Sequence, residues 1–200
     1  MKKLLFSLLF VTSLSLIAQN YSIPPLSPRQ TVDQQLSISN IKVDYGRPAI
    51  KGREIFGKLV PFNEVWRTGA NTCTKITFGQ DFMFGGKVVK AGTYGLFVIP
   101  TATEWTVILN SDSTQWGAYD FNAKLNVLET KVPVQKMANK QEWLKIDLDD
   151  LTENSVNLTF MWDTTKVNVP IMVAYPDEIT KIIGHLTEIN KVKGAIDKMK

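Results

Sequence analysis

The sequence contains one cysteine and one histidine in 200 residues. Because a single thiol has no partner within the chain, Cys73 excludes an intrachain disulfide, and we expect it to be a small buried apolar side chain. His185 stands alone near the C-terminus, which disfavours a zinc site of the usual ligands and a Ser-His-Asp or Cys-His catalytic arrangement. No glycine-rich phosphate loop precedes a helical segment. The sequence therefore predicts no metal ion and no cofactor.

A strong excess of one charge is also missing. The formal net charge is +4 at pH 7, and it includes Lys2 and Lys3 at the N-terminus. Acidic residues are spread through the rest of the chain, so there is no basic surface of the kind that nucleic-acid binding requires. We expect no nucleic-acid partner.

Long apolar runs are absent after the N-terminus. Lys2 and Lys3 precede an apolar run from Leu4 to Ile17, which closes at Ala18. This layout is typical of a secretory signal peptide, and the run is shorter than the roughly 20 residues that span a bilayer. We predict a signal peptide over residues 1–18 and an exported protein, periplasmic or secreted, that does not span the membrane after processing. An N-terminal membrane anchor is the alternative.

The remainder reads as short apolar segments separated by turn residues. A slip in the alternation at Asn40 suggests a β-bulge, and Gly85-Gly86 is a two-residue hairpin signal. The expected strands cover residues 36–45, 75–78, 81–84, 87–89, 93–99, 105–109, 125–132, 143–148, 155–162 and 166–173. About ten strands without helical patterns between them predict a mostly β fold, an antiparallel β-sandwich or jelly roll.

The C-terminal segment has a different period. Ile179, Ile182, Leu186 and Ile189 fall at helical spacing, and Pro176 suits the first position of a helix. We therefore expect one C-terminal amphipathic helix over residues 176–200, either packed on the sandwich or fraying from it. The domain organisation that follows is a signal peptide over residues 1–18, an extended segment over 19–33, a β-sandwich over 34–175 and the helix.

Arginine, glycine and aromatic residues are concentrated between Tyr45 and Asn71. Loops on a rigid β scaffold are where binding residues gather, and the arginine fork suits carboxylate, phosphate or sulfate and also stacks on aromatic rings. We predict a binding site for a small anionic or glycan ligand, with arginine and asparagine as its polar contacts and aromatic rings as its walls. The candidate residues are Arg47, Arg53, Trp66, Arg67, Asn71, Tyr94, Trp116 and Tyr119.

Three other interpretations stay open. The arginines could be structural, each paired with a nearby acid to hold a long loop; Asp44, Glu54, Glu64 and Asp81 are available. The chain could be a protein-interaction or envelope-structural module that uses edge strands and the terminal helix, with an unknown protein partner. It could also be a carboxylate-dependent hydrolase using two of Glu64, Asp81 and Glu104. The sequence favours a role without catalysis.

Several ordered motifs between Pro24 and Val173 are similar to those of one bacterial family. They are Tyr45-Gly-Arg-Pro, Lys51-Gly-Arg-Glu-Ile-Phe-Gly-Lys-Leu-Val-Pro, Trp66-Arg-Thr-Gly-Ala-Asn, Lys90-Ala-Gly-Thr-Tyr-Gly-Leu-Phe-Val-Ile-Pro, Glu104-Trp-Thr-Val-Ile-Leu-Asn and Gln115-Trp-Gly-Ala-Tyr. The chain resembles the family of exported proteins of unknown function numbered 2911, which is typical of the Bacteroidetes group. The resemblance implies an exported protein and implies no particular activity.

Overall fold

The computed structural model describes residues 23–199, so the predicted signal peptide at residues 1–18 lies outside the described residues. A short 3-10 turn, Ala123–Leu125, precedes β8. The strands are β1 Arg29–Leu36, β2 Ser39–Gly46, β3 Thr74–Phe78, β4 Phe82–Phe84, β5 Lys87–Val89, β6 Gly92–Pro100, β7 Glu104–Asn110, β8 Asn126–Asp149 and β9 Ser155–Val173, followed by helix α1, Pro176–Asp197. The predicted mostly β fold with one C-terminal helix is confirmed.

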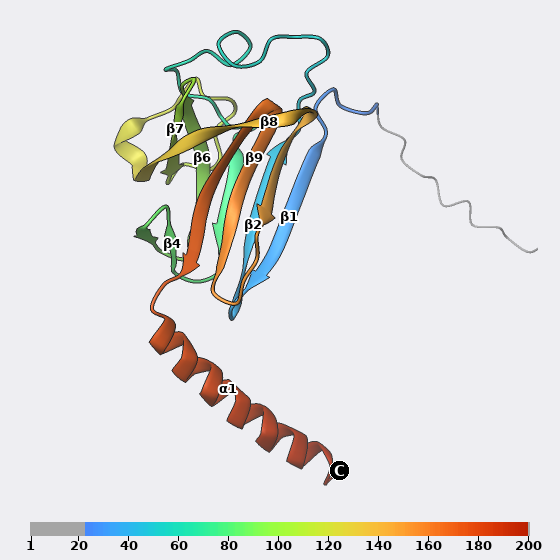
Figure 1. Cartoon of the computed structure of the whole chain (residues 1–200). Helices are drawn as coiled ribbons and strands as arrows, with labels where there is room; N and C mark the ends of the chain where they lie inside the picture. The colour runs from blue at the N-terminus through green and yellow to red at the C-terminus, as the bar shows by residue number, and fades with distance from the viewer. Residues whose placement is uncertain (1–22, 200) are drawn as a thin grey trace, which may run out of the picture.

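All neighbouring strands pair antiparallel, in the order β1-β2-β3-β6-β7-β8-β9-β4-β5. The 24-residue strand β8 pairs with β7 along its first part and with β9 along its second part, so it belongs to both halves of the sheet. The sheet folds over at β8, and β1 and β2 come to lie opposite β8 and β9 (Figure 1). The result is the β-sandwich-like arrangement that the alternating segments predicted.

Four of the expected strands are in fact two. Of the expected strands, 125–132 (from residue 126 onward) and 143–148 belong to the single strand β8, and residues 155–162 and 166–173 belong to β9. The register between β8 and β9 shifts between Lys136 and Gln141 and again before Lys145. These bulges let β8 bend while it stays hydrogen-bonded, and the exposed polar residues at the bend remove the apolar alternation that would have shown one strand.

The N-terminal edge also differs from the prediction. β1 begins at Arg29, inside the extended segment predicted over residues 19–33 and before the first expected strand at residue 36, and only Leu36 of this strand is buried. The slip at Asn40 is not a bulge: Leu36 pairs with Ser39 across a tight turn in which Ser37 has a φ of 61°. The predicted hairpin at Gly85-Gly86 is confirmed, since both glycines have positive φ between β4 and β5.

The main core fills the space between the two layers with large side chains. Its fully buried members include Tyr45, Phe78, Phe82, Phe84, Trp105, Phe160 and Trp162. Tyr45 also connects distant parts of the chain, because its hydroxyl oxygen accepts the backbone N–H of Ile146 at 2.9 Å.

Strand β6 is buried on both faces. Leu96 and Val98 face the main core, whereas Phe97 packs with Cys73 and Ile108 in a second, smaller cluster. Cys73 is fully buried, as predicted. This second cluster lies beneath loops and gives them a rigid base.

Helix α1 projects from the end of β9 and away from the sheet (Figure 1). It begins at Pro176, as expected, and Asp177 and Glu178 lie in its first turn. No residue of α1 is buried, and Ile179 is the partly buried apolar residue at its root that packs against the core. The helix therefore extends from the sandwich instead of covering it. No helix in residues 23–199 combines the length and hydropathy needed to cross a bilayer.

Candidate functional site

Two loops meet at one end of the sandwich. We call residues 47–72 the arginine loop and residues 111–125 the platform loop. The N–H of Gly117 donates to the carbonyl oxygen of Asn71 at 3.1 Å. Cys73, which directly follows the arginine loop, donates its N–H to the carbonyl oxygen of Gln115 at 3.1 Å. Thr72 and Trp116 form an isolated antiparallel bridge between the loops. The two loops therefore form one continuous surface.

The first two candidate arginines hold the backbone. Arg47 donates from Nε to the carbonyl oxygen of Leu144 at 3.0 Å. Arg53 donates from Nε to Ile50 O at 3.0 Å and from Nη2 to Ala49 O at 2.6 Å. A structural role was one of the interpretations of these residues, but the partners are backbone carbonyls and not the nearby acids.

Trp66 forms the floor of the arginine loop. Its backbone N–H and C=O both bond to Val98 of β6, and its indole N–H donates to Gly69 O at 3.3 Å. The ring stacks on Trp162 at a centroid distance of 5.9 Å and an interplanar angle of 17°, and it meets the rings of Phe56 and Trp105 edge-on. Trp66 remains partly exposed, so one side of it faces solvent.

The backbone between Trp66 and Asn71 is tightly folded. Thr68 and Asn71 have φ values of 57° and 66°, a conformation that costs non-glycine residues energy and that clusters at functional sites. A Cβ added to Gly69 would lie 2.9 Å from Gly46 O, so the loop packs backbone to backbone against the end of β2. Thr74 Oγ1 donates to Thr68 O at 2.8 Å and secures the turn. These constraints fix the direction in which Arg67 leaves the backbone.

Arg67 lies against an exposed aromatic pair. Its Cζ is 5.9 Å from the centroid of the Trp116 ring, a cation–π arrangement. Trp116 stacks on Tyr119 with centroids 5.9 Å apart and an interplanar angle of 16°. The two aromatic residues are 58% and 80% exposed. We call Trp116 and Tyr119 the aromatic platform. Arg67 Nε is buried and has no hydrogen-bond partner among the described residues.

Two cavities flank Arg67, and both are lined by Trp66 and Arg67. The Glu64 cavity, of about 400 Å³, is completed on its far side by Tyr119. The Asn71 cavity, of about 350 Å³, is lined additionally by Arg53, Asn71 and Trp162. Arg67 therefore borders both cavities and also lies beside the aromatic platform.

Six of the eight candidate residues come together here, and two do not. Tyr94 is a core residue: it is 9% exposed, packs on Phe78, and donates its hydroxyl proton to Lys90 O at 3.0 Å. Burial raises the pKa of Tyr94. Arg47 lines neither cavity, because its side chain turns toward β8. The residues that share the surface are Arg53, Trp66, Arg67, Asn71, Trp116 and Tyr119.

The three acids considered for hydrolysis are dispersed. Glu64 lines the cavity named after it. Asp81 accepts from Lys90 Nζ at 2.8 Å and from the N–H of Ala91 at 2.9 Å, and these hydrogen bonds lower the pKa of Asp81. Glu104 pairs with Lys131 at 3.2 Å. None of the described cavities brings any two of them together.

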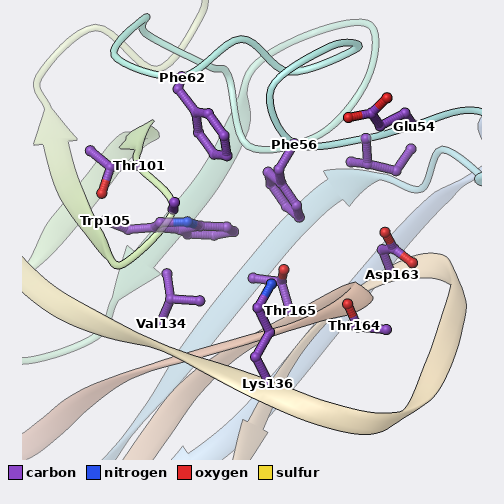
Figure 2. A pocket seen from close by; sticks show the side chains of 12 residues that line it. Glu54, Phe56, Phe62, Thr101, Trp105, Val134, Lys136, Asp163, Thr164 and Thr165 are labelled. Carbon is purple, nitrogen blue, oxygen red and sulfur yellow. The ribbon is translucent and has the colours of Figure 1, made fainter.

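A third hollow contains residues that the sequence analysis missed. This cleft of about 200 Å³ lies between the side chains of Phe56, Phe62 and Trp105 and the strands β8 and β9 (Figure 2). Glu54 and Asp163 both line it. Asp163 follows Trp162 at a turn-like position with a φ of 54°, and Lys140 Nζ lies 3.2 Å from its Oδ1. Sequence patterns give no signal for such a pair, since the two acids are far apart in the chain.

The cleft does not replace the platform surface as the main candidate. Lys140 already compensates the charge of Asp163. Within residues 23–199 no group of three or more His, Cys, Asp or Glu side chains is arranged to hold a metal ion. Glu54 and Asp163 are two acids of the kind that glycoside hydrolysis uses, but no exposed aromatic pair among the described residues stands beside them as it does beside Arg67.

Comparison with known proteins identifies a family for this chain. No curated protein and no solved structure is similar to the chain at a significant level. Residues 27–171 match the family described as protein of unknown function (DUF2911). That range runs from just before β1 almost to the end of β9, and it includes both loops of the candidate site. The chain belongs to the DUF2911 family of proteins of unknown function.

Proposed function

We propose that this protein is an exported binding module for an acidic carbohydrate, with Arg67 and the aromatic platform as its contact surface. The observation that carries the proposal is the exposed, stacked pair of Trp116 and Tyr119 with the Arg67 guanidinium against it. Export rests on the N-terminal sequence pattern at residues 1–18.

The chemistry of the surface suits a ring that carries a carboxylate or sulfate. Exposed aromatic faces offer a broad apolar contact to the C–H groups of a sugar ring, and well-placed polar groups fix its orientation. The guanidinium of Arg67 can bind an anionic oxygen pair through two parallel hydrogen bonds. Asn71 lines the adjacent cavity and can hydrogen-bond to hydroxyl groups. Together these groups favour uronic acid or sulfated sugars over neutral sugars.

The platform loop is held in place before any ligand arrives. Phe121 packs on Phe97 with centroids 5.0 Å apart, at the second hydrophobic cluster. The buried amide of Asn110 donates to Asn122 O at 3.0 Å and to Asn126 Oδ1 at 2.8 Å. At the other end of the loop, Gly95 has no Cβ that would collide with Asp112 O. An ordered surface loses less conformational entropy on binding, which favours affinity.

The test is a thermal-shift screen of the chain without residues 1–18. The panel consists of uronic acid oligomers, sulfated glycans, neutral oligosaccharides, phosphates and dicarboxylates. A ligand that binds only the folded state adds about 2.7 kcal/mol of stability at a hundred times its dissociation constant. We expect shifts from the uronic or sulfated sugars and not from their neutral counterparts.

Variants then locate the site by titration. Trp116→Ala and Arg67→Lys should each weaken binding about tenfold or more, since one removes the ring and the other the planar fork. Trp143→Ala is the matched control, because Trp143 is an exposed tryptophan of β8 that lines neither cavity. Equal loss in all three variants, or no shift from any acidic sugar, would contradict the proposal.

A further inference from the structure

Beyond Ile179 at its root, the large apolar residues of α1 are exposed and are not covered by any other part of the described chain. Ile182, Ile183, Leu186, Ile189 and Ile196 are each between 41% and 62% exposed. The helix also contains two glycines, Gly184 and Gly194, with open space around them. Each weakens a helix by about 1 kcal/mol, and most helical stability in proteins comes from packing of an apolar face. An uncovered apolar stripe on such a helix indicates a binding surface.

The stripe has the seven-residue period of a coiled coil. Ile179 and Leu186 with Lys193 occupy one core position, and Ile182, Ile189 and Ile196 occupy the other. This alternation of three and four residues gives a period of about 3.5, which keeps a seam facing one partner helix. The partner that fits this seam is therefore another helix with the same kind of repeat.

The charges of α1 select that partner and its direction. The first half, residues 176–186, carries Asp177 and Glu178 with one lysine, whereas residues 187–198, which include the C-cap residue Lys198, carry Lys191, Lys193 and Lys198 with Glu188 and Asp197. A parallel pair of identical helices would place like charges together. An antiparallel pair places the acidic half of each helix beside the basic half of the other. We propose that α1 forms an antiparallel pair with α1 of a second copy of this chain.

A groove at the root of the helix extends the seam onto the sandwich. It has a volume of about 460 Å³ and lies between Ile179, Ile183 and Leu186 of α1 and Ile38 and Glu153 of the sandwich. In the antiparallel pair, the basic second half of the partner's helix reaches this end, where Glu153 adds to the negative charge of Asp177 and Glu178. The apolar wall of the groove continues the seam through the exposed Ile38.

The experiment measures the mass of the chain without residues 1–18 by sedimentation equilibrium across a range of concentrations. The wild type should reach the dimer mass, and its far-ultraviolet helix signal should rise with concentration. Leu186→Asp should weaken the dimer by at least about tenfold, because it places a charge in the seam. Val127→Asp is the matched control, since it changes an exposed apolar residue of β8 and should leave the dimer intact.

Charge exchange tests the direction of the helices. The double variants Asp177→Lys with Glu178→Lys, and Lys191→Glu with Lys193→Glu, should each dimerise more weakly than the wild type, and a mixture of the two should recover a mixed dimer. Thermal unfolding of the sandwich confirms that every variant is folded.

A wild type that stays monomeric, or a dimer that is insensitive to Leu186→Asp, overturns the proposal. So does a monomer that binds anionic vesicles, because that result assigns the apolar face to a membrane surface. If the double charge variants dimerise as strongly as the wild type, the antiparallel arrangement is overturned.

Discussion

Two regions of the arginine loop, each with arginine close to glycine, use arginine in opposite ways. In residues 47–53 the guanidinium groups donate to backbone carbonyls, and they hold the loop against β8 and against itself. In residues 66–71 the loop is held instead by Trp66, Thr68 and Gly69, and Arg67 lies against the exposed Trp116 ring. An arginine in this loop is therefore structural when free carbonyls lie within reach, and is available to a ligand when the backbone is satisfied by other groups.

The largest expected effect separates the two tryptophans of this region. Trp66→Ala should lower the free energy of unfolding by about 3 kcal/mol, because it removes a ring packed on Trp162, Trp105 and Phe56. Trp116→Ala should change it by less than about 0.5 kcal/mol, since that ring is mostly exposed. Urea unfolding of both variants measures the difference. Similar losses of unfolding free energy in the two variants would show that Trp116 is part of the folded core, as Trp66 is.

A smaller difference should separate the arginines. Arg53→Ala leaves the carbonyls of Ile50 and Ala49 without their side-chain donors, and it should cost about 1–2 kcal/mol of unfolding free energy. Arg67→Ala removes a cation–π contact and a donor that has no partner among the described residues, so it should cost less than about 1 kcal/mol. Urea unfolding at neutral pH compares the unfolding free energies of the two variants. Arg53→Lys keeps the charge but lacks the guanidinium fork, so it separates the two contributions. A larger cost at Arg67 would assign it a structural role as well.

The smallest effect concerns the end of the 66–71 region. Arg29 donates to Asp44 and to Thr72, which follows Asn71. Partial burial alone would raise the pKa of Asp44, but hydrogen bonds from Arg29 and Thr31 and the charge of Arg29 hold it below its ordinary value of 3.8. A lowered folded-state pKa contributes stability that is present above pH 3.8 and is lost as the pH falls through the folded value.

We therefore expect wild type to exceed Asp44→Asn in unfolding free energy by about 0.5 kcal/mol or less at about pH 5, since the pair is partly exposed. The difference should shrink as the pH falls below 3.8 and through the lowered folded-state pKa of Asp44, because the carboxyl group then becomes protonated in both states. Chemical unfolding at several pH values tests this. A difference that does not depend on pH would show that the charge of Asp44 does not anchor the region.

Much of the architecture could be predicted from sequence. Strand alternation, the Gly85-Gly86 hairpin and the start of α1 at Pro176 depend on local patterns that the sequence contains directly. β1 was missed because an edge strand needs almost no apolar residues, and only Leu36 of it is buried. The continuity of β8 through Lys136 was missed because a bend exposes both faces of the strand and removes its period.

Only part of the candidate site could be predicted from the sequence, because composition is local whereas the orientation and proximity of side chains depend on the fold. Composition indicated the arginine loop, because arginine, glycine and aromatic residues are concentrated between Tyr45 and Asn71. The same reasoning proposed Trp116 and Tyr119 as aromatic walls of a site. It could not show that Tyr94 faces the core, since a tyrosine in a strand reads the same in either orientation. Nor could it bring Glu54 and Asp163 into one cleft, because that proximity depends on the bend shared by β8 and β9.

The long strand β8 also has a consequence for how the protein folds and unfolds. Its first part completes the half of the sheet that contains β7, and its second part completes the half that contains β9. Neither half can separate without breaking a strand of the other, so equilibrium unfolding should occur as one cooperative transition. The hydrogen bond between Tyr45 and Ile146 joins residues 101 positions apart, and such distant pairings slow folding. The strand shared by the two halves thus predicts cooperative unfolding at equilibrium, and the pairing of distant residues predicts slow folding.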